Sequence, residues 1–426
     1  MHRQDETQRE IPATTHLGLL LVLLFAATTL NYGDRQAFPA AGVRIKSELQ
    51  LNNEEYGQVE GDFGLAFAFG GLLGGVLADS VSVRWLYALV LLLWSGAGMA
   101  TGWATGYETL WLSRVGLGFF ASTHWACALR TTQRVFPPGK RPLANSILQA
   151  GAPVGAILPS IFLLGFVSGD GGTSWRDMFW CLGALGVPWV IGWLLVVKAR
   201  DLTRDVEQTD DDAEGGVMPM EELGFFSILA SRRFWVLMWL VICINTCWHF
   251  IRVWLPIALE DELRYTPDEA QSIMIGYWVA TFAGSLACGW LTSLLRYRGW
   301  GTHRARLAVF LGFSIVTSLT VIAAALPPSW FFVALLLFVG FGSLGQFPIY
   351  YSLVQELSAT NQAKVGGVLG FSTWAVLYFM HPRVGRVMDQ APDLQPYIFG
   401  AMGVLPLLSW LTLATLWKSR PTRGAE

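Results

Sequence analysis

Four polar residues interrupt an apolar stretch near the start of the chain. An apolar run from Leu17 to Leu30 is followed by Asn31, Tyr32, Asp34 and Arg35 before the apolar character resumes up to residue 40. A charged side chain inside a membrane helix costs about 2.5–3.5 kcal/mol on insertion scales, so such groups face the protein interior or a water-filled cavity. There the guanidinium can bind a carboxylate through two parallel hydrogen bonds, and the carboxylate can bind and release a proton. The alternative is that the helix ends before Asn31 and the polar cluster lies beyond it.

A second polar group lies in the later apolar stretch 234–259. Asn245, His249 and Arg252 are spaced i, i+4 and i+7, which places them on one face of a helix. Pro256 follows one turn later and is expected to break the helix, and broken helices line transporter sites. Arg252 therefore faces a cavity, or it forms an ion pair with another helix. In the first case the two halves of the chain each supply one cation for a carboxylated ligand.

The apolar stretch 108–129 carries a third group. Arg114 and His124 lie about 80° apart around a helix, while Arg130 lies about 160° from the face of Arg114. His124 is a candidate for a proton-binding role, and the alternative is a hydrogen-bonded packing histidine. Trp125 is a candidate to pack against a sugar ring, with core packing as the alternative. Arg130 is expected to anchor the cytoplasmic end of the helix.

These residues must be positioned by membrane helices. The chain is 53% hydrophobic and only 14% charged, against about 25% charged residues in a soluble domain. Hydrophobic stretches of spanning length recur at 17–40, 57–78, 85–105, 108–129, 143–167, 177–197, 234–259, 268–295, 305–326, 328–352, 364–386 and 395–417.

The fold class predicted from this pattern is an all-α integral membrane protein with twelve transmembrane helices in two six-helix lobes. We expect a cytoplasmic tail (1–16), a first lobe (17–197), a cytoplasmic linker (198–233) that is acidic and flexible, a second lobe (234–417) and a cytoplasmic tail (418–426).

The Lys and Arg residues predict the orientation. With both termini in the cytoplasm, twenty Lys and Arg lie in the inner segments against four in the outer loops, and such an excess marks the cytoplasmic side. Glu60 and Asp62, at the outer start of the second stretch, are expected to be solvated, or alternatively to attract cations.

The composition and motifs also exclude several classes of protein. The net charge of -2 gives no indication of nucleic-acid binding, and the five cysteines lie in apolar stretches without the spacing of a disulfide framework or a metal site. There is no phosphate-binding G-x-x-x-x-G-K-[ST] loop and no catalytic constellation. We therefore expect neither an enzyme nor a bound cofactor or metal.

A glycine-rich motif that ends in an acid follows the second apolar stretch. The sequence GGVLAD ends at Asp79 and is followed by Arg84, which resembles the loop motif of the major facilitator superfamily. Ser80 and Ser82 depart from it, since a cation and a glycine are usual there. The resemblance implies that Asp79 and Arg84 act in gating rather than in substrate contact.

Five further stretches resemble the anion:cation symporter family, and most closely its hexuronate-transporter-like branch. They cover both halves of the chain in order: NYGDRQA at 31–37, RVGLGFFASTHW at 114–125, WHFIRVWLP at 248–256, QFPIYYSLVQELS at 346–358 and KVGGVLG at 364–370. This family transports sugar acids and other organic anions.

The resemblance implies roles for individual residues. Tyr32, Asp34 and Arg35 match the first-helix motif, in which Arg helps to bind the substrate carboxylate and Asp takes part in proton coupling. Arg114 matches the fourth-helix Arg, but the acidic residue expected seven positions later is Ala121 here, which weakens the expectation of proton symport.

The tenth helix adds two candidate ligands, and the function follows from the whole set. Gln346 and Tyr350 lie one turn apart and are candidates to hydrogen-bond sugar hydroxyls.

We expect a monomeric secondary transporter in the inner (cytoplasmic) membrane that moves a small organic anion, a hexuronate-like sugar acid, together with a proton or sodium ion. The alternatives are an anion exchanger or uniporter, an exporter of amphipathic compounds, and a transporter-like sensor.

Overall fold

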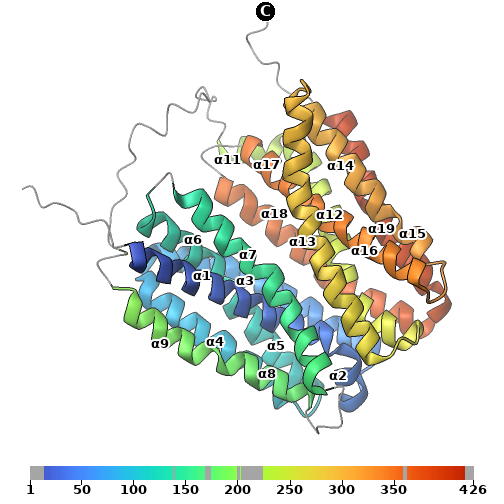
Figure 1. The fold of residues 1–426 in the computed structure, drawn as a ribbon, viewed down its shortest axis with the longest axis horizontal. Helices are drawn as coiled ribbons and strands as arrows, with labels where there is room; N and C mark the ends of the chain where they lie inside the picture. Colours follow the sequence, from blue (N-terminus) through green and yellow to red (C-terminus); the bar gives the residue numbers. More distant parts are fainter. Residues whose placement is uncertain are drawn as a thin grey trace, which may run out of the picture.

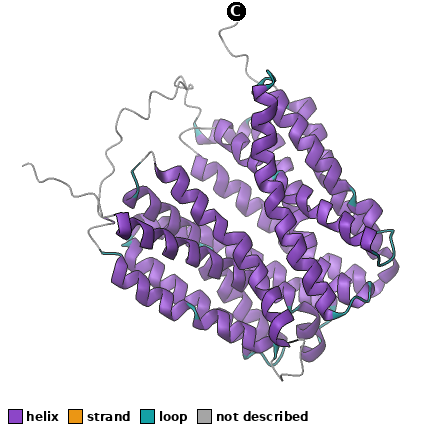
Figure 2. Ribbon diagram, viewed as in Figure 1, coloured by secondary structure: helices purple, strands orange, loops and turns teal. Residues whose placement is uncertain are grey.

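A computed structural model describes residues 14–137, 140–167, 174–198, 202, 224–357 and 362–417. All regular secondary structure in these ranges is helical (Figure 2). The predicted tails, apart from residues 14–16, and most of the predicted linker, including its acidic tract, lie outside the described residues.

The first half of the chain forms six membrane-length rods. They are α1 (Thr14–Ala40), α3 (Asn53–Ser80), α4 (Val83–Gly102), α5 (Tyr107–Ala121) continued by α6 (Thr123–Val135), α7 (Arg141–Phe162) continued by a π-helix (Leu163–Val167), and α8 (Trp175–Ala184) continued by α9 (Gly186–Val196). The short helix α2 (Gly42–Leu49) connects α1 to α3.

The second half repeats this arrangement after the short helix α11 (Phe225–Ala230). Its rods are α12 (Arg232–Ile257) continued by the π-helix η4 (Ala258–Glu262), α13 (Pro267–Tyr297), α14 (Thr302–Ser318) continued by α15 (Thr320–Ala323), α16 (Trp330–Gly345) continued by α17 (Phe347–Leu357), α18 (Gln362–Gln390), and α19 (Gln395–Leu416), which follows the 3₁₀ turn η5 (Pro392–Leu394).

Ten of these rods are long and apolar enough to cross a membrane. The other two are α5–α6 and α18, which are helical as predicted but more polar, because α5–α6 carries Arg114 and His124 and α18 carries three basic or imidazole side chains near its end. Both are integral to the bundle, since α5 packs on α3 and α4 and α18 packs along α3.

The prediction that Pro256 breaks its helix is wrong. Helix α12 continues through Pro256 to Ile257 and passes into η4. A proline removes one backbone donor and is tolerated in a membrane helix when local π-type adjustment satisfies the freed groups. The widened turn that follows therefore takes the place of the expected break.

The two lobes lie side by side and approach each other at the end that carries α2, while α11 lies at the opposite end (Figure 1). We call these the α2 end and the α11 end. Between the lobes α3 packs along α18 and α7 along α13.

Three glycines of α3 permit the close approach of α18. A Cβ on Gly57 would clash with the backbone of His381, one on Gly61 would lie 3.0 Å from the carbonyl oxygen of Tyr378, and one on Gly64 would lie 2.6 Å from the ring of Trp374. We call Gly57, Gly61 and Gly64 the glycine seam.

Charged pairs connect the lobes around the α2 end. Lys46 Nζ lies 3.3 Å from Asp261 Oδ2 and Arg44 Nη1 lies 3.6 Å from Glu260 Oε1. Arg386 of α18 pairs with Glu54 of α3. In addition, Asp389 accepts hydrogen bonds from the backbone N–H groups of Asn53 (3.1 Å) and Glu54 (2.9 Å). The α2 end is therefore closed in this conformation.

Candidate functional site

The polar residues of α1 lie within the helix, as the main interpretation of the sequence predicted. Helix α1 runs unbroken from Thr14 to Ala40, so the alternative, a helix that ends before Asn31, is wrong. The Asn31 side chain donates a 2.9 Å hydrogen bond to the carbonyl oxygen of Ala121, which fixes α1 against α5. Asp34 and Arg35 are both buried.

Arg35 is a buried cation surrounded by aromatic rings. Its guanidinium carbon lies 5.0 Å from the ring centre of Tyr32, 4.6 Å from that of Phe67 and 5.9 Å from that of Trp374. Tyr32 and Phe67 belong to the first lobe, and Trp374 belongs to α18 of the second. Among the described residues we find no hydrogen bond or ion pair to this guanidinium, and its Nε is buried without a partner. The rings stabilise the charge but leave its hydrogen-bonding edge free.

Arg114 and Arg252 are instead held by a single carboxylate. Arg114 Nη2 donates to Glu60 Oε2 at 3.0 Å, and Arg252 Nη2 donates to Glu60 Oε1. All three side chains are buried, and Arg252 Nη1 also lies 3.4 Å from Gln36 Oε1. The alternative interpretation of Arg252, an ion pair with another helix, describes this conformation.

The other two residues of the α12 face differ in their surroundings. Asn245 donates a 2.8 Å hydrogen bond to the carbonyl oxygen of Val241 in its own helix. His249 is buried with its ring centre 4.6 Å from that of Trp374, which also lies over Arg35. His249 therefore borders the Arg35 cage, and Asn245 is partly exposed one turn away.

Asp34 points away from that cage. Both carboxyl oxygens are buried without a hydrogen-bond partner among the described residues. A Cβ on Gly98 of α4 would lie 3.3 Å from Asp34 Oδ1, so the carboxyl faces α4 inside the first lobe. Trp94 of α4, whose indole nitrogen is also buried without a partner, lies beside this carboxyl. A buried carboxylate without donors is strongly disfavoured.

His124 lies in the core of the first lobe. Its Nδ1 is 2.8 Å from the Tyr87 hydroxyl and its Nε2 is 3.2 Å from Thr28 Oγ1. The ring contacts Trp94 and Trp125 edge to face. Both nitrogens are thus occupied by hydroxyl groups, and the surroundings match those of a packing histidine.

The two candidates on the tenth transmembrane rod lie inside the second lobe. Gln346 Nε2 donates a 2.9 Å hydrogen bond to Thr317 Oγ1 of α14. Tyr350 is buried in the hydrophobic core around α12 and α17. Its neighbour Tyr351 is 54% exposed and lies close enough to Tyr32 of the first lobe to interact electrostatically with it. Tyr351 was not predicted from the sequence.

The two gating candidates form contacts within the first lobe. Asp79 lies 3.5 Å from Arg130 Nη1, and both side chains are exposed to solvent to a large degree. Arg84 donates to the carbonyl oxygens of Leu194 (2.8 Å) and Val197 (2.6 Å) at the end of α9. A cation at that position satisfies the unpaired carbonyl groups of a helix C-terminus.

Glu60 is the residue that the sequence reasoning placed wrongly. It was expected to be solvated, yet it is buried between Arg114 and Arg252. Two features of the sequence could have indicated that Glu60 is buried. Two arginines lie in membrane helices, while Ala121 stands where an acid was expected, and the glycines Gly57 and Gly61 lie on either side of Glu60. Buried cations need a counter-charge, and glycines that admit another helix bury the face on which they lie.

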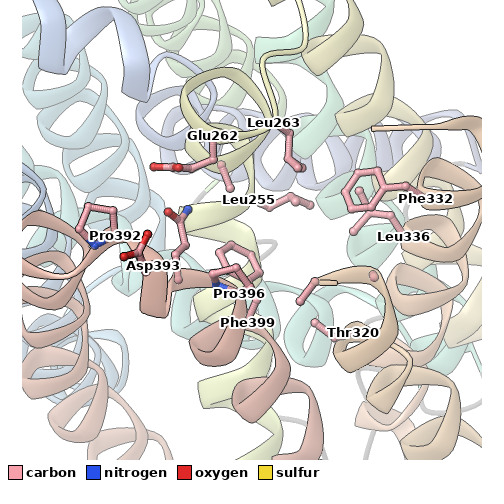
Figure 3. A pocket seen from close by; sticks show the side chains of 14 residues that line it. Leu255, Glu262, Leu263, Thr320, Phe332, Leu336, Pro392, Asp393, Pro396 and Phe399 are labelled. Carbon is pink, nitrogen blue, oxygen red and sulfur yellow. The ribbon is translucent and has the colours of Figure 1, made fainter. Parts of the chain in front are cut away.

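A separate cavity of about 370 Å³ lies at the α2 end of the second lobe, between α12, η4, α15, α16 and α19 (Figure 3). Its lining is mostly apolar, with Phe332 and Phe399 among the lining residues and the carboxylates of Glu262 and Asp393 at the cavity. None of the predicted site residues lines it, so the candidate site remains the region around Arg35 and Glu60.

The arrangement of two six-helix lobes can be compared with known proteins. The sequence model of the Major Facilitator Superfamily matches residues 24–382. The chain belongs to the Major Facilitator Superfamily. It is therefore a multi-pass membrane transporter and not an enzyme.

Individual relatives agree with this assignment. The hexuronate transporter of Escherichia coli (strain K12) is 22% identical over 417 residues, covering 94% of each chain. The D-galactonate transporter of Escherichia coli O6:H1 is 24% identical over 370 residues, covering 83% of this chain and 85% of that one.

A solved structure shows the same fold. A bacterial homologue of the human lysosomal transporter Spinster, in an inward-facing and unoccupied conformation, superimposes with a TM-score of 0.74 at 18% identity, covering 96% of this chain and 100% of that one.

Proposed function

We propose that the protein is a secondary transporter that moves a small carboxylated sugar, a sugar acid such as a hexuronate, across the cytoplasmic membrane by alternating access with proton symport. The observation that carries this proposal is Arg35, a buried guanidinium with no anionic partner among the described residues and with aromatic rings from both lobes around it. The names of the relatives, which transport hexuronate and D-galactonate, support the substrate class.

The geometry supports a division of roles. Arg35 would grip the carboxylate through two hydrogen bonds, while Tyr32 and Trp374 contact the sugar ring and His249 supplies a polar edge. Arg252 would join this site only when it leaves Glu60. Asp34, with its unpartnered oxygens, would provide a proton-binding group in the first lobe.

The closed α2 end would face the outside. The Lys and Arg bias favours a cytoplasmic α11 end, so the conformation described here would be closed to the outside. Asp79 and Arg84 would lie on the cytoplasmic side, where they support gating through Arg130 and the end of α9.

The test is uptake of labelled glucuronate or galacturonate into proteoliposomes, with and without an inward proton gradient. We expect gradient-stimulated uptake by the wild type and loss of most uptake in Arg35→Gln, because an amide cannot pair with the carboxylate. Arg383→Gln is the matched control, since Arg383 is an exposed arginine of α18. Full uptake by Arg35→Gln would remove this arginine from the site.

Anion exchange is the second candidate function, favoured by Ala121, which leaves α5 without the expected acid. If the protein is an exchanger, the rate of uptake should not depend on the proton gradient and should rise with the concentration of sugar acid inside the vesicles. The same vesicles distinguish the two functions.

A further inference from the structure

Glu60 is positioned to respond to relative movement of the lobes. It lies on α3 of the first lobe, and its two oxygens are shared between Arg114 of that lobe and Arg252 of the other. The Arg114 guanidinium is covered by the rings of Phe38 and Phe63, whose centres lie 4.6 and 4.3 Å away. Glu60 is thus the only carboxylate among the described residues that pairs with buried arginines of both lobes.

The position of this triad in the bundle matters as much as its charges. Glu60 lies between Gly57 and Gly61 of the glycine seam, close to the α2 end. When the lobes separate at that end, Arg252 and α18 must move away from Glu60. An ionised Glu60 would then lose one of its two cations, which is unfavourable for as long as the carboxylate remains buried. A protonated Glu60 has no such penalty.

The other groups around Glu60 come from three helices. From α1 come Arg35 and Gln36, from its own helix Tyr56, and from α18 His381. Trp254 donates a 3.2 Å hydrogen bond to His381 Nδ1, so that nitrogen carries no proton. The ring therefore remains neutral while this hydrogen bond exists, and the positive charges nearest to Glu60 are arginines, which do not titrate in the physiological range.

We infer that Glu60 is the coupling acid at the α2 end: its carboxylate joins the lobes through Arg252, and that end opens when Glu60 takes up a proton. The proton comes from the α2 side as that end begins to separate and adds to a Glu60 oxygen. The acid becomes neutral, and Arg252 is freed to approach the substrate carboxylate. When the α2 end closes again, Arg252 returns and the proton leaves towards the α11 end. This inference rests on the proposed transport function.

Asp34 cannot perform the same step. Its carboxyl faces α4 within the first lobe, and it pairs with no group of the second lobe among the residues described. Protonation of Asp34 therefore changes no contact between the lobes, whereas protonation of Glu60 does.

The first experiment measures opening without measuring transport. Spin labels at Glu108 of α5 and Asp268 of α13, both exposed at the α2 end, report the separation of the lobes in nanodiscs, in a Cys181→Ser background because Cys181 is the exposed native cysteine among those described. We expect the wild type and Asp34→Asn to gain a longer distance at acidic pH. Glu60→Gln should show the longer distance at both acidic and alkaline pH, and Glu60→Asp should retain the response.

The control is Asp62→Asn on the same helix. Asp62 accepts hydrogen bonds from Gln58 and Trp111 and lies outside the triad. It should behave as the wild type. A pH-dependent distance that persists in Glu60→Gln, or that disappears in His381→Gln instead, would overturn the inference.

The second experiment separates this inference from the proposed function. Glu60→Gln should lose gradient-driven accumulation but keep counterflow of labelled sugar acid between vesicle and medium. A wild type without counterflow would contradict the proposed function, while the spin-label result would still decide the role of Glu60. Accumulation by Glu60→Gln equal to that of the wild type would overturn the inference alone.

Discussion

Arg35 and Arg114 show how the same side chain in two membrane helices serves different ends. Both are buried and both lie against aromatic rings. Arg114 has a carboxylate partner, so its charge is compensated within the protein, whereas Arg35 lacks one among the described residues. The sequence identified both arginines because charge inside an apolar stretch is conspicuous. It did not identify Glu60 as the partner, because that pairing depends on three helices that are distant along the chain.

A double-mutant cycle tests the buried pair. Arg114→Gln leaves Glu60 with one cation, and removal of one partner of a buried ion pair costs about 3–5 kcal/mol. We therefore expect a clear decrease in the melting temperature of the purified protein. The double variant Arg114→Gln with Glu60→Gln should lose less stability than the sum of the two single variants, because Arg114 is no longer present to be left without its counter-charge. Strictly additive effects would mean that the two side chains do not interact.

At the scale of the helix, hydropathy predicted all twelve rods but not their interruptions. The rods begin and end near the predicted limits because apolar length is set by the bilayer. The irregular features had weaker signals. Pro256 was expected to break α12, yet α12 persists to Ile257 and a π-helix follows. Which face of α3 meets α18 also depends on packing, and the glycines alone did not name the partner helix.

The glycine seam gives a prediction at this scale. Gly57→Val places a branched side chain against the backbone of His381, which prevents close approach of α18 to α3. The variant should fold but populate conformations with the α2 end open, seen as a longer distance between labels at Glu108 and Asp268. Gly75→Val on the same helix is the control, since nothing lies within 4 Å of a Cβ there. Equal distances in both variants would show that the seam does not control closure.

At the scale of the whole molecule, the lobes are held at the α2 end by pairs of opposite charge. Three of the charged groups lie on α2 and the start of α3, and their partners lie on η4 and α18. The pairs are Lys46 with Asp261, Arg44 with Glu260, and Glu54 with Arg386. The sequence predicted which side these residues occupy. It could not predict that they pair across the lobes, because the contacts between the lobes of an alternating-access carrier differ from one conformation to another.

A charge exchange tests this closure. Lys46→Glu places a second negative charge opposite Asp261. We therefore expect a larger fraction of molecules with the α2 end open and a changed rate of exchange transport. Adding Asp261→Lys restores opposite charges and should restore the wild-type distance distribution. Surface pairs contribute only about 0–1 kcal/mol each, so the shift should be partial. A double variant that behaves like the single one would exclude a direct pairing.

The glycine seam has a consequence for the speed of the transport cycle. At Gly57 and Gly61 the seam places glycine against backbone, so no interlocking side chains must change rotamer there when one helix slides or tilts on the other. The resistance to movement then comes from the charged groups around the seam rather than from the seam itself. Dissolved ions weaken contacts between exposed charges, whereas they act little on packed apolar contacts. The frequency with which the α2 end opens should therefore depend on the ionic strength of the medium at that end.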